Sequence, residues 1–132
     1  MSNEIIAHYL LQLRQSKSED TFFALIHLDE SQVPDLINTY HDETNVDIQA
    51  LLVEIISHYR QQASLSFLAS ALQNHNPQIW KNALDGIVSI GGQASIQMLE
   101  AQKQRLFVEK HSSERVEWIE EALQQIQENN LD

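Results

Sequence analysis

The feature that most constrains the fold is the stretch from residue 68 to residue 95, LASALQNHNPQIWKNALDGIVSIGGQAS. Two segments with apolar residues at helical spacing meet there at Asn76-Pro77. Asparagine is a preferred N-cap, and proline is tolerated at the first helical position, so this dipeptide indicates a helix start. Gly91-Gly92 indicates the end of that helix. The stretch therefore predicts two helices joined by a short turn.

Helical spacing of apolar residues continues along nearly the whole chain. Only three glycines and two prolines interrupt its 132 residues. The pattern predicts eight helices, at about residues 3–15, 18–28, 31–40, 46–60, 63–73, 76–91, 94–108 and 113–126. No linker or low-complexity segment separates them, so we expect one all-α domain over residues 1–132.

Two of the predicted helix pairs match in their apolar positions when one is shifted by 31 residues. The shift aligns Ile48 with Ile79, Leu52 with Ala83, and Ile56 with Ile87. A further unit follows, with Trp118 in the place of Ile79, after an insertion within residues 103–113. One helix pair cannot bury its apolar face alone, whereas stacked pairs bury a continuous core. We therefore expect antiparallel helix pairs stacked one on the next.

The segment NPQIWKNALDGIVSIGGQAS, residues 76–95, resembles the second helix of the HEAT repeat family. The resemblance spans about residues 33–127 and implies an α-α superhelix in which the second helices of the pairs line one broad face. The chain departs from the family in two ways. The family often has arginine after the first apolar position, where this chain has Gln49, Trp80 and Ile119, and the third unit is lengthened.

The sequence predicts neither a catalytic site nor a metal site. The chain has no cysteine, which excludes thiol chemistry and cysteine zinc sites. Glu4–His8 and Glu54–His58 each have the spacing of two ligands on one helix face, but no third ligand accompanies them. Gly91-Gly92 follows a helix and lacks the Lys-Ser/Thr pair of a phosphate-binding loop. We therefore expect a non-enzyme that needs no cofactor.

The net charge of −11, from 19 acidic and 8 basic residues, indicates which partners the chain attracts. Nucleic acid and anionic membranes are repelled, whereas a basic protein is attracted and steered. An acidic surface that serves solubility alone is the other interpretation. The first residues lack the basic start of a signal peptide, and no apolar run approaches the roughly 20 residues of a membrane span. We therefore expect a cytoplasmic protein.

The acidic residues are unevenly distributed along the chain. Between Lys17 and Arg60 there are nine carboxylates and no lysine or arginine. Asp47 and Glu54 are seven residues apart on one side of a predicted helix, away from its apolar face. The candidate contact residues for a partner are Asp42, Glu43, Asp47, Glu54, Trp80, Asp85, Glu117, Glu120 and Glu121.

The two tryptophans receive different predictions. We expect Trp80 to lean towards solvent, where its rigid ring would anchor a partner, and Trp118 to lie in the core. A partly buried packing role for Trp80 remains the alternative.

These observations favour a protein-binding module. The chain resembles small acidic bacterial immunity proteins, some of them all-helical and HEAT-like, including those of contact-dependent growth inhibition systems. That resemblance implies an inhibitor whose acidic helical surface occludes the active site of a basic toxin nuclease, which we expect to be a ribonuclease. The alternative is a HEAT-type adaptor or scaffold that binds a helix or tail of its partner through the insertion around residues 103–113.

Overall fold

The computed structural model describes residues 4–16, 19–109 and 113–129. In these ranges the chain is built of α-helices and two short 3-10 turns, and it forms no β-strand, which confirms the all-α prediction. The elements are α1 (Glu4–Ser16), α2 (Glu19–Ile26), η1 (Glu30–Gln32), α3 (Val33–Asp42), α4 (Val46–His58), η2 (Gln62–Ser64), α5 (Leu65–Leu72), α6 (Pro77–Ile90), α7 (Gly92–Glu109) and α8 (Ser113–Asn129).

Helix α6 begins and ends at the residues predicted from the sequence. The Asn76 side chain accepts hydrogen bonds from the first-turn amides of Gln78 and Ile79, at 2.9 and 3.2 Å, and Pro77 is the first helical residue. These bonds satisfy two backbone donors that the helix itself leaves unpaired. Gly91 ends α6 with a φ of 65°, a conformation that glycine adopts without steric cost.

Some of the predicted helix boundaries differ from the structure. The third and fifth helices begin later than expected, because the 3-10 turns η1 and η2 precede α3 and α5. The predicted start of the second helix at Ser18 lies outside the described residues. The seventh helix was expected over residues 94–108, and α7 spans Gly92–Glu109, so the first part of the insertion lies in this helix.

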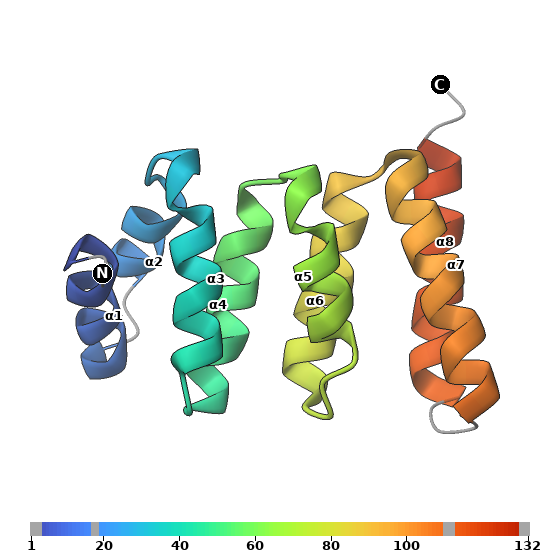
Figure 1. Ribbon diagram of the computed structural model, residues 1–132, viewed down its shortest axis with the longest axis horizontal. Coiled ribbons are helices and arrows are strands. Elements are labelled where there is room, and N and C mark those ends of the chain that lie inside the picture. Colours follow the sequence, from blue (N-terminus) through green and yellow to red (C-terminus); the bar gives the residue numbers. More distant parts are fainter. Residues whose placement is uncertain (1–3, 17–18, 110–112, 130–132) are drawn as a thin grey trace.

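The helices lie in four consecutive pairs, with α1–α2 and α7–α8 at opposite ends of a row (Figure 1). Within each pair the two helices pack against one another. In addition α2 packs against α4, α4 against α6, and α6 against α8, so the even-numbered helices form one layer. The helices α3, α5 and α7 lie on the other side of this layer (Figure 1). Each even-numbered helix therefore turns one face to the core and the opposite face outwards.

One apolar cluster runs through all eight helices. The residues that the 31-residue shift aligns in α4 and α6 are all at most 1% exposed: Ile48, Leu52, Ile56, Ile79, Ala83 and Ile87. In α8 the aligned residues Ala122 and Ile126 are also buried, but Trp118, in the place of Ile79, is 39% exposed, and the adjacent Ile119 is fully buried instead. The placement of Trp118 in the core was therefore wrong.

A tyrosine at the end of α4 fastens the first helix pair to the second. The Tyr59 hydroxyl donates a hydrogen bond to the Leu25 carbonyl at 2.5 Å and accepts one from the Leu28 amide at 3.0 Å. Both partners lie where α2 ends, so the bonds satisfy backbone groups that the helix terminus leaves unpaired. No helix in the described ranges is both long and apolar enough to cross a bilayer.

Candidate functional site

The layer of even-numbered helices carries exposed carboxylates on its outward side, and we call this surface the acidic face. It comprises Asp47 and Glu54 of α4, Asp85 of α6, and Glu117 and Glu121 of α8, all of them exposed. Residues seven apart on a helix lie on the same side, two turns away from each other. Each of these residues is exposed and lies away from the buried residues of its helix, and α4, α6 and α8 are consecutive in one layer, so we assign them to the outward side of that layer.

A groove of about 210 Å³ lies on the acidic face between α4 and α6. It is lined from one side by Glu54, Ser57, His58 and Arg60, and from the other by Asn82, Asp85, Gly86 and Ser89. Glu54 and Asp85 therefore meet in one groove although they belong to different helix pairs. The two residues are brought together by the packing of α4 against α6, and their spacing in the sequence does not predict this proximity.

The groove is narrow at its base because α4 and α6 approach closely there. A Cβ atom on Gly86 would lie 2.8 Å from the Cβ of Ser57 and collide with the Ser57 hydroxyl. The Asn82 side-chain amide of α6 donates a hydrogen bond to the Ala50 carbonyl of α4, at 2.9 Å. The Ser57 hydroxyl donates to the Val53 carbonyl one turn earlier, at 2.7 Å. These contacts fix the separation of the two helices and thereby the width of the groove.

The two carboxylates of the groove lack a neutralising partner among the described residues. No lysine, arginine or histidine nitrogen in that part of the chain lies within 4.0 Å of Glu54 or Asp85. Burial raises the pKa of the Asp85 carboxyl above its usual range. The ionised Asp85 carboxylate has thus lost hydration without gaining a cation in return. Such a carboxylate favours the approach of a positive charge.

Aromatic rings border the groove on the side of α2. The ring of His58 packs edge-on against Phe22, with 5.5 Å between ring centroids. The next residue, Phe23, is 59% exposed and stacks with His27 at 5.6 Å. Phe23 was not among the contact residues selected from the sequence, and its exposure leaves it accessible to a partner.

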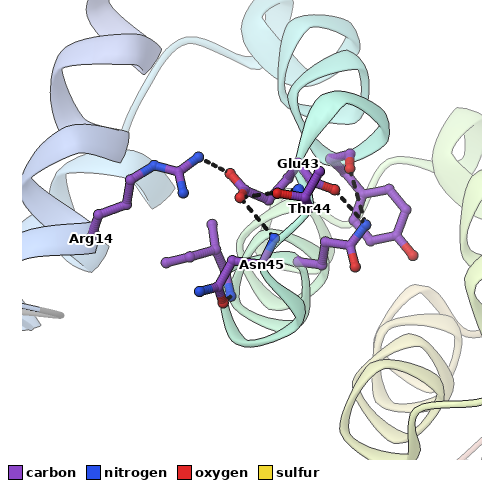
Figure 2. A network of polar contacts seen from close by, with 7 residues as sticks. Arg14, Glu43, Thr44 and Asn45 are labelled. Atoms are coloured by element: carbon purple, nitrogen blue, oxygen red, sulfur yellow. Dashed lines mark hydrogen bonds and ion pairs between the residues drawn. The ribbon is translucent and has the colours of Figure 1, made fainter.

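Glu43 does not belong to the acidic face, contrary to its selection as a contact residue. Its side chain is 2% exposed and is bound inside the protein (Figure 2). Arg14 of α1 donates to one carboxylate oxygen. The amides of Thr44 and Asn45 donate to the other, at 3.2 and 3.0 Å. Glu43 therefore ties α1 to the turn between α3 and α4.

These contacts also determine the ionisation of Glu43. Burial raises its pKa, but the hydrogen bonds from Asn45, Arg14 and Thr44, together with the Arg14 charge, outweigh that effect. The pKa of Glu43 is consequently lower than its ordinary value. Its neighbour Asp42 is exposed at the end of α3, on the rim of the molecule instead of the acidic face.

The two tryptophans have exchanged the positions predicted for them. Trp80 is 3% exposed, so the expectation that it leans towards solvent was wrong. It faces α8, where the Trp118 ring contacts it edge-on at 5.9 Å and the Arg115 guanidinium lies 4.9 Å from its ring centre. The more exposed Trp118 is covered on one side by the Lys81 ammonium, at 4.8 Å. Trp118 is thus the tryptophan that a partner can reach.

The carboxylates of α8 divide into two groups. Glu117 and Glu121 are exposed on the outer side of the helix. Glu120 instead lies on the flank towards α7, with its carboxylate 4.0 Å from the Lys103 ammonium, and Glu114 lies 3.9 Å from Lys81 of α6. Exposed pairs at such distances contribute little to stability. Glu114 and Glu120 are thus neutralised locally, whereas Glu117 and Glu121 remain part of the acidic face.

The described residues contain no group of three or more histidine, aspartate or glutamate side chains that could hold a metal ion. Comparisons of the chain with models of protein families, with curated proteins and with solved structures found no match. The function must therefore be argued from the surface itself.

Proposed function

We propose that this protein is a HEAT-like α-α solenoid that binds a basic protein through its acidic face. The stacked helix pairs and the matching buried positions of α4 and α6 support the solenoid. One observation carries the binding proposal. Glu54 and Asp85, from consecutive helix pairs, line one groove without a neutralising cation from the described residues. A protein surface normally intersperses charges of both signs, so this arrangement indicates a surface that a cationic partner covers.

The partner class that fits the acidic face is a basic nuclease, and the protein would act as its inhibitor. A nuclease cleft is lined with cations that hold phosphates, and carboxylates placed across it exclude nucleic acid. The net charge of −11 accelerates the encounter, and close contacts in the groove then slow dissociation. This is the action of an immunity protein that neutralises a toxin ribonuclease, as in contact-dependent growth inhibition, within the cytoplasm.

The adaptor function has less support. It places the contact region in the insertion within residues 103–113, but α7 continues as helix through residue 109 and Lys103 lies beside Glu120. No separate surface feature in the described residues favours a helix or tail at this end of the row. We therefore retain the inhibitor as the proposed function.

The proposal is tested by immobilising the protein and identifying the proteins that it retains from a lysate of the cells that naturally express it. Two double variants, each with the same change in net charge, are compared with the unaltered chain. Glu54→Lys with Glu117→Lys reverses charge on the acidic face, whereas Glu4→Lys with Glu100→Lys reverses it on exposed positions of α1 and α7. A basic nuclease retained by the unaltered chain and the second variant, but lost by the first, supports the proposal. Equal retention by the two double variants contradicts it.

A further inference from the structure

We propose that the groove between α4 and α6 is a binding site for one arginine side chain of the partner, with the guanidinium held between Glu54 and Asp85. The inference rests on the proposed function, because it names the group that a basic protein inserts into the acidic face. It is narrower than the proposed function, because a basic protein could bind the acidic face without any single side chain entering a defined site.

The size of the groove selects a side chain and not a larger element. About 210 Å³ is available between the two helices, and the close approach at Gly86 closes the base. A helix about 10 Å across cannot enter such a space. A single long side chain can, with its aliphatic part along the groove and its charged end at the base.

The charge of the groove selects a cation. Glu54 and Asp85 contribute two carboxylates, and no described cation lies within 4.0 Å of either one. Arg60 also lines the groove and, like Glu54 and Asp85, is exposed, so its charge offsets one of the two carboxylates and leaves the other uncompensated. A cation that reaches the base of the groove therefore meets a net negative charge.

The hydrogen-bonding groups distinguish arginine from lysine. Ser57 lines the groove, and because its hydroxyl donates its proton to the Val53 carbonyl, the oxygen can act only as an acceptor towards a further partner. With the two carboxylates it offers acceptors on both walls. A planar guanidinium with five N–H donors can bind acceptors on two sides at once, whereas an ammonium is a compact point charge with three donors. The pair Glu54 and Asp85 thus favours arginine.

The experiment titrates the ¹⁵N-labelled protein with N-acetyl-arginine methylamide and, separately, with N-acetyl-lysine methylamide, and follows backbone amide shifts by NMR. We expect saturable shifts at Ser57, Gly86 and Ser89 with the arginine compound, and at least threefold weaker binding of the lysine compound. Glu54→Gln and Asp85→Asn should each weaken arginine binding about tenfold, as the loss of one charge-assisted hydrogen bond predicts. Glu100→Gln, at an exposed position of α7 outside the acidic face, is the control and should change the affinity less than twofold.

Three results would overturn the site: no shift at these three amides, equal affinity for the two compounds, or equal affinity of Asp85→Asn and the unaltered chain. The amide spectra of the free variants show directly whether each has kept its fold. Failure here is distinct from failure of the proposed function. If the arginine compound does not bind but the nuclease is lost on charge reversal, only the arginine site is wrong. If the compound binds but no basic protein is retained, the function is wrong and the site stands.

Discussion

Among single residues, Glu43 shows how a carboxylate from an acidic segment becomes structural. We predict that Glu43→Gln lowers the free energy of unfolding by about 2 kcal/mol at pH 7, because a charged acceptor with partners on both oxygens is lost. Urea denaturation at pH 7 measures this. The adjacent Asp42→Asn is the control, because Asp42 is exposed, and it should stay within about 0.5 kcal/mol of the unaltered chain.

The lowered pKa of Glu43 also predicts how this difference depends on pH. A carboxyl whose folded-state pKa is depressed stabilises the fold above its unfolded-state pKa, which is ordinarily 4.5. That stability is lost as the pH falls through the folded-state value. The difference between Glu43→Gln and the unaltered chain should therefore shrink below pH 4.5. A difference that stays constant down to the acid transition would contradict the assigned hydrogen bonds.

Asp85 is the opposite case, because burial raises its pKa above the ordinary 3.8. Its ionised form costs folding free energy at pH 7, so we predict that Asp85→Asn is at least as stable as the unaltered chain there. The cost disappears as the pH falls through the raised pKa towards 3.8, and the two proteins should then converge. Thermal unfolding across this range measures the effect. A variant that is clearly less stable at pH 7 would show that Asp85 has a stabilising partner.

Among the elements, the contact of α4 with α6 determines the groove. Gly86→Ala should destabilise the protein by about 1 to 3 kcal/mol, because the added methyl group overpacks against Ser57. Helix propensity alone predicts the reverse, a gain of about 1 kcal/mol. Ser89→Ala, exposed one turn later on α6, provides the control and should gain a few tenths of a kcal/mol. Stabilisation by Gly86→Ala, measured in urea, would contradict the close approach of the helices.

The elements are also where prediction from the sequence was most successful. Helical periodicity, the Asn76-Pro77 start and the Gly91 stop depend on neighbouring residues, and so they identified α6 and its buried positions. The residues whose exposure was predicted wrongly are those that contact residues far away in the sequence. Glu43 is buried by an arginine 29 residues away. Trp80 is buried because Trp118 and Arg115 of α8 pack against its ring.

For the whole molecule, the row of helix pairs explains why the candidate site was only partly predictable. Seven-residue spacing placed Asp47 and Glu54 on one side of α4. That Glu54 shares a groove with Asp85 depends on the packing of α4 against α6, which only the assembled structure reveals. The same assembly assigned Glu120 to the flank of α7 and left Phe23 exposed beside α4.

The central claim, that the acidic face captures a basic protein, is tested most directly by association rates. The retained nuclease is mixed in stopped flow with the unaltered chain, with Glu54→Lys/Glu117→Lys, and with the control Glu4→Lys/Glu100→Lys, at increasing salt. We predict that reversal on the acidic face slows association about tenfold or more at low salt, that the control slows it much less, and that salt reduces these differences by screening. Equal rates for the two double variants, or rates that salt leaves unchanged, would contradict the account.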